Sequence, residues 1–145
     1  MPTPLESLQQ LVDGRIPPPP IAGLIGFTLT SVTHGQAVIE LAAGRQHANP
    51  MGTLHGGVLC DIADAAMGIA YASTLAEGET FTTLELKINF LKPVWNAKLR
   101  ATGRFVKGGK TLGLVECDVT DEDQDLVARA SSTCMTLRGD QGSGR

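Results

Sequence analysis

Alternating apolar and polar residues predict β-strands over much of the chain. Residues 25–33 and 36–43 both alternate in this way, and His34-Gly35 between them is typical of a tight hairpin turn. Four further segments with strand character follow, at residues 81–91, 97–107, 111–120 and 126–137. Because tight turns join these four segments, the pattern predicts six strands that pair in an antiparallel sheet.

The segment at residues 81–91 shows the clearest alternation. One of its faces is expected to be apolar and contains Leu84, Leu86, Ile88 and Phe90. The other face is expected to be polar and contains Thr83, Glu85, Lys87 and Asn89. The period of two therefore predicts that Thr83 points away from the apolar side chains of its strand.

Helical patterns account for two other segments. Residues 56–75 are rich in alanine, isoleucine and leucine and lack proline, which predicts one long buried helix. A shorter helix is predicted over residues 3–13, where Thr3 and Glu6 have the spacing of a capping box. The prolines at 17–20 favour a stiff, extended connector, with a proline-rich ligand for another protein as the alternative.

The order of elements is two strands, one long helix and four strands, which indicates the α+β class. One helix cannot cover both faces of a six-stranded sheet. We therefore expect the sheet to wrap around the helix and to leave an edge free for a second subunit. The chain has 145 residues, the size of a single domain. We divide it into an N-terminal helix and connector (1–20), a main domain (21–138) and a flexible tail (139–145).

Composition narrows the class of protein. The chain is 42% hydrophobic and 19% charged with a net charge of −3, which fits a globular domain and argues against a nucleic-acid partner. Without an apolar stretch of membrane-spanning length or a signal-peptide pattern, a cytoplasmic protein with no membrane partner is expected. Cys60, Cys117 and Cys134 lie far apart and form no metal-binding motif, so we expect buried thiols in a reducing compartment and no metal.

The most chemically distinctive residues lie where a loop meets the long helix. Gly56 and Gly57 follow His55 at the predicted helix start, where backbone N–H groups are unpaired and the helix dipole is positive. Because glycine has no side chain, a ligand oxygen can approach these amides closely. The junction therefore meets the requirements of an oxyanion or anion site. The alternative is that the glycines only make the turn.

Asp64 interrupts the apolar pattern of the long helix. A carboxylate in such surroundings is costly unless it is paired or has a chemical role. Asp61 lies three residues earlier on the same side of the helix, so repulsion predicts that one of the two has a raised pKa or faces water. The structural alternative is that each carboxylate bonds a backbone or basic group.

Helix geometry separates His55 from Asp64. The two residues are nine positions apart, which corresponds to ~13.5 Å of rise and about half a turn out of phase. In one chain they are expected to point away from each other. If both serve one reaction, a second copy of the chain must supply one of them, and a two-fold dimer would contain two such composite sites.

A known family shares the pattern of this junction. Its residues are, in order, Asn49, Gly52, His55, Gly56, Gly57 and Asp64. This motif resembles that of hotdog-fold acyl-CoA thioesterases, and the phenylacetate-degradation (PaaI-like) branch is the most similar type. The strand order and the segment LELKINFLKPV are also similar, so that the resemblance covers residues 22–137. It implies an antiparallel sheet wrapped around a central helix, and thioester hydrolysis without a metal or cofactor.

The resemblance also implies roles for individual residues. Asp64 would be the general base that activates water, or the nucleophile that attacks the thioester, and the Gly56 amide would hold the oxyanion. Asn49 would position the water or the thioester, and His55 would orient the loop and stabilise the oxyanion side. Thr83 lies where the family often has a serine or threonine that assists the carboxylate across the interface, although a plain strand threonine is the alternative.

Residues that bind the substrate are implied for two regions. Lys107, Gly109 and Lys110 resemble the basic turn that related thioesterases place near the CoA phosphates, and Gly57 completes the substrate-binding set. Candidates for an apolar pocket around the acyl group are Ala65, Ala66, Met67, Ala70 and Tyr71. The expected partners are an acyl-CoA and other copies of the chain, in a dimer or a dimer of dimers.

Other functions and chemistries also fit the sequence. A hotdog dehydratase or hydratase would pair His55 with a carboxylate, and a non-catalytic module would bind acyl-CoA without turnover. A cysteine nucleophile is possible because Cys60 could meet a histidine in space. His34 and His47 are expected to be solvated, with His47 as a candidate for contact with substrate. The sequence leaves open whether the acyl group is aryl or alkanoyl.

Overall fold

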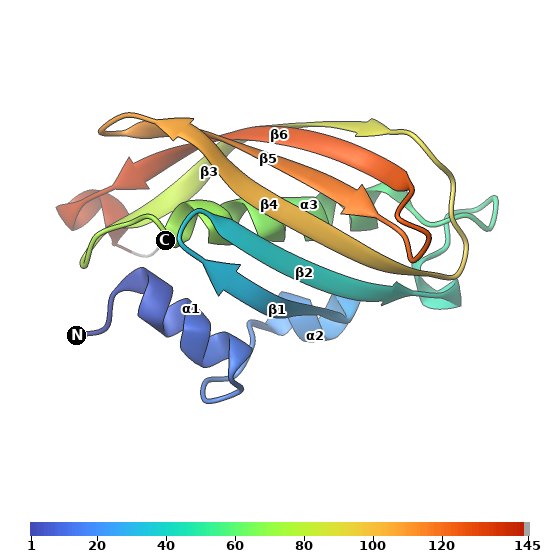
Figure 1. Cartoon of the computed structure of the whole chain (residues 1–145), viewed down its shortest axis with the longest axis horizontal. Coiled ribbons are helices and arrows are strands. Elements are labelled where there is room, and N and C mark those ends of the chain that lie inside the picture. The colour runs from blue at the N-terminus through green and yellow to red at the C-terminus, as the bar shows by residue number, and fades with distance from the viewer. Residues whose placement is uncertain (144–145) are drawn as a thin grey trace.

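The computed structural model describes residues 1–143 of the chain (Figure 1). Within this range, six strands surround one long helix, and shorter helices lie toward both ends. The elements are α1 (Pro4–Val12), α2 (Pro20–Ile25), β1 (Phe27–Thr33), β2 (Gln36–Ala43), η1 (Arg45–His47), α3 (Gly56–Ala72), β3 (Thr80–Phe90), β4 (Ala97–Gly108), β5 (Leu112–Thr120), β6 (Leu126–Leu137) and η2 (Gly139–Gly142).

The six strands form one antiparallel sheet in the order β1-β2-β4-β5-β6-β3. The sheet curves around α3, and β1 and β3 are its two edges (Figure 1). Because α3 carries the chain across the sheet, β3 starts at the far edge and pairs with β6, not with β2. This confirms the predicted α+β architecture, a sheet of six strands wrapped around one long helix.

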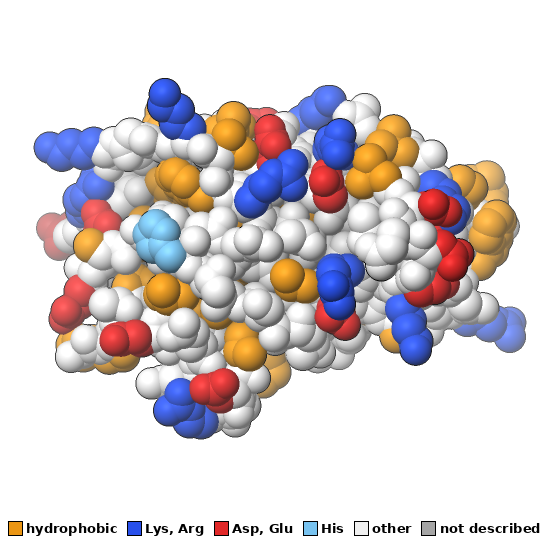
Figure 2. All heavy atoms as spheres, in the orientation of Figure 1, with side chains coloured by type: hydrophobic (Ala, Val, Ile, Leu, Met, Phe, Trp, Pro, Cys, Tyr) orange, Lys and Arg blue, Asp and Glu red, His pale blue; other side chains and the backbone are white. Residues whose placement is uncertain are grey.

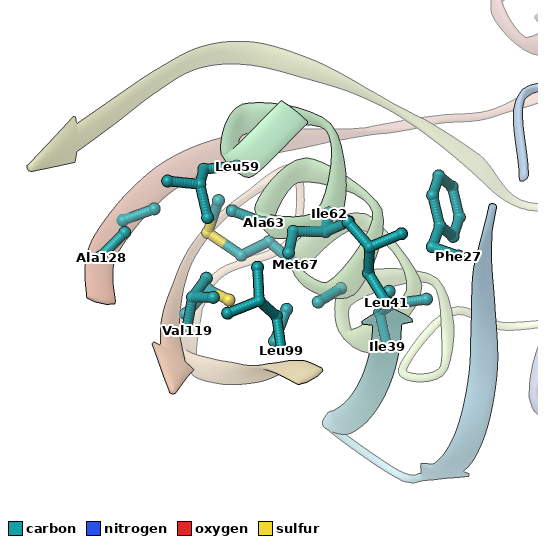
Figure 3. Close-up of a cluster of buried hydrophobic side chains, with 14 of the residues drawn as sticks. Phe27, Ile39, Leu41, Leu59, Ile62, Ala63, Met67, Leu99, Val119 and Ala128 are labelled. Carbon is teal, nitrogen blue, oxygen red and sulfur yellow. The ribbon is translucent and has the colours of Figure 1, made fainter. Parts of the chain in front are cut away.

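The core lies between α3 and the concave face of the sheet. Ile62, Ala63 and Met67 of the helix are buried and point toward the strands, where Leu99 and Val119 meet them (Figure 3). Complete burial of a large aliphatic side chain contributes about 1.5–3 kcal/mol of transfer free energy. Burial therefore fixes which face of α3 meets the sheet, and so which residues face the other way.

At Gly103 of β4, the backbone of α3 lies almost against the strand. A Cβ atom at this position would be 2.3 Å from the carbonyl oxygen of Ala66 and 2.8 Å from the backbone nitrogen of Met67. Both are helix backbone atoms, which cannot move aside as the end of a flexible side chain can. A residue without a side chain is therefore required where the helix rests on the sheet.

We expect Gly103→Ala to destabilise the fold by about 3 kcal/mol, because the added methyl group overpacks this backbone contact. Urea unfolding followed by circular dichroism measures the change as a lower midpoint. Gly109→Ala is the matched control, since nothing lies within 4 Å of its Cβ position, and its midpoint should stay close to that of the wild type. Equal midpoints for the two variants would contradict the close packing of α3 on β4.

The predicted N-terminal helix is confirmed as α1. The Thr3 hydroxyl accepts the Glu6 amide proton at 3.2 Å and the Glu6 carboxylate accepts that of Thr3 at 2.7 Å, which is the predicted capping box. The connector is shorter than predicted, because Pro20 is the first residue of α2, a position where proline loses no hydrogen bond. The helix ends at Gly26, whose φ of 98° favours glycine.

A bulge in β3 overturns the predicted faces of this strand. The pairing with β6 shifts between Thr83 and Glu85, so Leu84 is an extra residue that alternation alone does not account for. As a result Thr83 faces α3, with its hydroxyl 3.4 Å from Oδ1 of Asp64. Leu86 packs against the core on the same side, whereas Leu84 is 51% exposed.

Charged side chains are prominent on the outer face of the sheet. Figure 2 shows Lys and Arg side chains interspersed with Asp and Glu on the side formed by β2, β4 and β5. Ion pairs on this sheet include Arg100 with Glu40 at 3.2 Å and Arg129 with Asp118 at 2.7 Å. The outer face therefore has charges of both signs in paired positions.

The last element is a short 3-10 helix, η2, at the start of the predicted tail. The final two residues of that tail, 144 and 145, lie outside the described residues. Among the helices of residues 1–143, none combines the length and the apolar character needed to cross a membrane.

Candidate active site

Asn49 shapes the loop between β2 and α3. Its side-chain oxygen accepts the amide protons of Met51 and Thr53 at 2.9 and 3.1 Å, and its amide group donates to the Thr53 hydroxyl at 2.6 Å. The Gly52 amide closes the turn on the Asn49 carbonyl at 3.0 Å, and its φ of 93° favours glycine. These bonds use one of the two N–H donors of the Asn49 side chain, so the other is available to a ligand.

The expectation that His47 is solvated is wrong. The imidazole is buried, with Nδ1 accepting the Gly44 amide proton at 3.1 Å and Nε2 lying 2.6 Å from the carbonyl oxygen of Ile25. Nε2 therefore carries the proton and donates it to that carbonyl. His47 anchors the loop to the end of α2, which is a structural role.

The start of α3 contains one engaged and one unpaired amide. His55 is the N-cap, and its Nδ1 accepts the Gly57 amide proton at 2.8 Å. The Gly56 amide has no acceptor among residues 1–143, and it lies at the positive end of the dipole of a 17-residue helix. The Gly56 N–H is therefore free to donate a hydrogen bond to a ligand, whereas the Gly57 N–H already donates to the His55 ring.

Neighbouring side chains lie close to both glycines. A Cβ atom on Gly56 would lie 3.0 Å from the ring of Phe90, and one on Gly57 would lie 2.9 Å from Nδ1 of His55. The residues Asn49, Gly56 and Phe90 line a pocket of about 460 Å³ at this end of the helix. Phe90 lines this pocket, whereas sequence alternation assigned Phe90 only to the apolar face of its strand.

Asp64 lies in the middle of α3, on the side away from the core. The Thr83 hydroxyl donates a long hydrogen bond of 3.4 Å to its carboxylate. The side chain of Asp64 is exposed in the single chain, but partial burial of its carboxyl by surrounding protein atoms still raises its pKa above that of an ordinary carboxyl. The bond from Thr83 lowers this pKa, and the charge of Asp61 raises it. The structure thus brings Asp64 and Thr83 together in one chain.

Asp64 lies at a cavity of about 550 Å³ with mostly apolar walls. Of the residues predicted for an apolar pocket, Ala65 lines this cavity. The prediction is wrong for the others, which are buried in the core instead, namely Ala66, Met67, Ala70 and Tyr71. A helix presents different residues to opposite sides, and Gly68 and Ile69 are the ones on the cavity side.

In one chain, Asp64 and the Gly56 amide serve different pockets. The two cavities share no lining residue, and the separation of eight positions between Gly56 and Asp64 corresponds to ~12 Å of helix. A catalytic carboxylate and an oxyanion donor must each come within about 3 Å of the reacting atoms. A single chain therefore contains both groups without bringing them together.

Comparison with known proteins decides the family. The family model of the thioesterase superfamily matches residues 51–128, which include all of α3, β3, β4 and β5. The chain belongs to the thioesterase superfamily. A 1,4-dihydroxy-2-naphthoyl-CoA hydrolase from Listeria monocytogenes is 31% identical to this thioesterase over 109 residues, which are 75% of this chain and 89% of that protein.

Solved structures of similar proteins have the same fold. A phenylacetic acid degradation-related protein from Ralstonia eutropha JMP134 is 29% identical, with a TM-score of 0.79 and coverage of 88% of this chain and 97% of that one. The PaaI protein of E. coli is 25% identical, with a TM-score of 0.81 and coverage of 90% and 94%. This thioesterase is accordingly a thioester hydrolase with a hotdog fold of the PaaI-like type.

The predicted CoA-binding turn of the thioesterase lies at the other end of α3 from Gly56 (Figure 1). Lys107 and Gly109 line a shallow pocket of the β4–β5 turn, and the Lys110 carbonyl accepts a hydrogen bond from Arg138. The same hairpin packs on the end of α3, since a Cβ atom on Gly113 would meet the ring of Tyr71 at 2.5 Å. Within one chain the structure does not bring these residues to the Gly56 amide.

The cysteines of the thioesterase are poorly suited to act as nucleophiles. Burial raises the pKa of Cys60, and the charges of Asp61 and Asp64 raise it further. Burial also raises the pKa of Cys117 to about 12 and raises the pKa of Cys134. Since the thiolate is the reactive form, these shifts favour the carboxylate of Asp64 over a thiol.

One cluster of acidic side chains in residues 1–143 has the spacing of a metal site. The carboxylates of Asp121, Asp123 and Asp125 offer oxygen atoms within 4.8 Å of one another. Asp121 is already engaged, because its Oδ1 accepts the amide protons of Asp123 and Asp125 at 3.0 Å and its Oδ2 accepts from Lys92 at 2.6 Å. We assign the cluster to closure of the β5–β6 turn.

Proposed function

We propose that this protein hydrolyses acyl-CoA thioesters in composite sites, each formed by two copies of the chain. The observation that carries the proposal is Asp64, a carboxyl group with a raised pKa at an apolar cavity in a chain of the thioesterase superfamily. An apolar cavity suits an acyl group. A carboxyl pKa that moves toward the working pH suits proton transfer in the rate-limiting step.

Asp64 acts at the thioester carbonyl. As a general base it takes a proton from the water molecule that attacks the carbonyl carbon. The C–S bond then breaks, and Asp64 returns the proton to the leaving CoA thiolate, so the products are a free acid and CoA. Direct attack by the carboxylate, followed by hydrolysis of the resulting anhydride, uses the same residues. In both routes Thr83 orients the carboxylate through its hydroxyl.

The second chain supplies the group that holds the oxyanion. Its Gly56 amide, which is unpaired at the start of α3, donates to the carbonyl oxygen as negative charge develops there. Asn49 positions the water or the thioester with its remaining N–H. His55 orients the loop through its bond to Gly57 and stabilises the oxyanion side.

The free edge of the sheet supports a dimer. β3 is an edge strand that pairs only with β6 among residues 1–143, and long unpaired edges are templates for another chain. Exposed apolar side chains lie on or next to this strand, at Leu84, Phe90 and Leu91. A two-fold partner that pairs with β3 covers these side chains and gives two equivalent sites. A dimer of two such dimers is the larger assembly that we propose.

We assign the CoA moiety to the basic β4–β5 turn. Lys107 and Lys110 are exposed and offer two ammonium groups to phosphate oxygens, with Gly109 between them. Gly57 lies next to Gly56, beside the thioester carbonyl. We propose a CoA ester with an aryl or a short- to medium-chain acyl group as the substrate. The Listeria relative is named as the hydrolase of a dihydroxynaphthoyl-CoA, which supports the aryl group.

We assign this activity to residues 21–138 as one domain and treat residues 1–20 as an N-terminal element. The three cysteines, Cys60, Cys117 and Cys134, are free. Free thiols fit a reducing compartment, and we propose the cytoplasm as the location of the enzyme.

Release of CoA thiol from acetyl-, octanoyl- and benzoyl-CoA tests the proposed function. We expect saturable turnover of at least one ester by the wild-type protein, at ~1 s⁻¹ or faster as is usual for enzymes. Binding of these esters in calorimetry without release of thiol would instead identify a non-catalytic binding module. Hydration of an enoyl-CoA without thioester cleavage would identify a hydratase of the same fold.

A further inference from the structure

The N-terminal segment forms one side of the cavity that contains Asp64. Nine of the nineteen residues that line this cavity belong to residues 11–22, and the others come from β1, β2, α3 and β3. Figure 1 shows α1 and α2 beside the β1 edge of the sheet. Without residues 11–22 the cavity would be an open groove on α3, so this segment is its outer wall.

The wall and the rest of the cavity are apolar apart from Thr28 of β1 and the end where Asp64 and Thr83 lie. The outer wall contributes Leu11, Val12, Ile16, Ile21, Ala22 and three prolines. Asp64 is the one titratable residue among the nineteen that line the cavity. A ligand in this space must therefore be apolar where it meets the wall, with its polar, reacting group at Asp64.

The size and aromatic character of the cavity indicate a large ligand group. Its volume of about 550 Å³ lies within the range of ~300–1,000 Å³ that holds drug-sized ligands. Phe27 and Phe81 both line it, so the cavity has two aromatic rings despite the low aromatic content of the chain. An acetyl group would leave most of this space unfilled.

The wall has a defined shape before any ligand binds. The capping box at Thr3 and Glu6 holds the start of α1, and Asp13 and Arg15 form an ion pair at 2.8 Å in the turn that follows. Pro19 has the φ of −66° and ψ of 154° of a polyproline segment, which is stiff. A preformed wall loses little conformational entropy when a ligand contacts it.

We infer that residues 11–22 act as a selectivity wall, which favours large apolar acyl groups over acetyl at the Asp64 site. The inference rests on the proposed function, since it assigns the acyl part of the substrate to this cavity. Each methylene group of the acyl chain that moves from water into contact with the wall is expected to raise kcat/KM about fourfold. A medium-chain alkanoyl or an aryl group reaches the wall, whereas an acetyl group does not.

Ile21 and Leu24 provide a matched pair for the test. Both are exposed apolar residues of α2, at 46% and 80%, but only Ile21 lines the cavity. Ile21→Trp fills part of the cavity, so we expect kcat/KM for octanoyl- or benzoyl-CoA to fall about tenfold or more. The value for acetyl-CoA should stay within about twofold, and Leu24→Trp should leave all three esters within about twofold.

The outcomes separate this inference from the proposed function. A loss confined to octanoyl-CoA assigns an alkanoyl chain to the wall, and a loss confined to benzoyl-CoA assigns an aryl group. Equal changes for all three esters, or no change for any, would overturn the inference. If Ile21→Trp does not fold, Ile21→Ala removes the same wall contact and should lower the preference for the large ester over acetyl-CoA. Absence of turnover in the wild type would overturn the proposed function instead.

Discussion

Asp64→Asn is expected to lower kcat for thioester hydrolysis by about 10²–10⁴, which is the usual contribution of a general acid–base group. The amide has the shape of the carboxyl group but can neither take a proton from water nor attack the carbonyl carbon. Because the carboxylate acts in the transition state, KM should change much less than kcat. Release of CoA thiol, measured over a range of ester concentrations, gives both values.

Asp61→Asn is the control for this experiment. Asp61 lies three residues before Asp64 on the same helix and carries the same charge, but it does not line the cavity. We expect its kcat to stay within about threefold of the wild type, as for a substitution away from the reacting atoms. Equal losses of kcat in the two variants would show that removal of any negative charge from α3 lowers activity. This result would contradict the specific role of Asp64.

The folded state of Asp64→Asn should be at least as stable as that of the wild type at neutral pH. Because the pKa of Asp64 is raised in the folded protein, its ionisation is disfavoured there and costs stability as the pH rises through the raised pKa. Below the ordinary pKa of a carboxyl group this cost is absent. Urea unfolding at ~pH 4 and ~pH 7 should therefore show the variant gaining stability relative to the wild type at the higher pH.

Local sequence patterns predicted most of the fold because they determine strand and helix directly. Alternation over residues 36–43 and the proline-free apolar run from Gly56 predicted β2 and the start of α3 at the residues where the structure has them. The capping box at Thr3 and Glu6 was predictable because both of its bonds lie within four residues.

The bulge in β3 could not be predicted from alternation. It arises where β3 meets β6, whose residues lie about fifty positions later, as in the pairing of Thr83 with Cys134. Because one extra residue exchanges the two faces of a strand, the bulge turns Thr83 toward Asp64. Such a bulge depends on the register between two strands that are distant in the sequence, so a local pattern cannot predict it.

The residues of the candidate site divide into those that a local sequence pattern reveals and those that only the tertiary structure reveals. Gly56 and Asp64 were predictable from the sequence, since a glycine at a helix start and a carboxylate in an apolar helix each break the pattern around them. Phe90 and Ile21 follow the patterns of their own segments, and only the tertiary structure places them at the two pockets. His47 was misjudged because its two partners, Gly44 and Ile25, become neighbours only on folding.

Mixing two inactive variants should restore activity if each site takes residues from two chains. Asp64→Asn removes the carboxylate, and Asn49→Ala removes the side chain that shapes the loop next to Gly56. If equal amounts are unfolded together and refolded, half of the dimers are mixed. Each mixed dimer has one site with both substitutions and one site with neither. Half of the sites in half of the dimers are then intact, so about one quarter of the wild-type activity is expected.

The same experiment tests the central claim that the carboxylate in the middle of α3 and the oxyanion donor at its start act together only across two chains. Each variant refolded alone is the control and should retain about 1% of the wild-type rate of CoA release or less. Recovery of about one quarter of the wild-type rate in the mixture is the result that we predict. A mixture no more active than the two variants refolded separately would mean that each chain contains a complete site, and would contradict the claim.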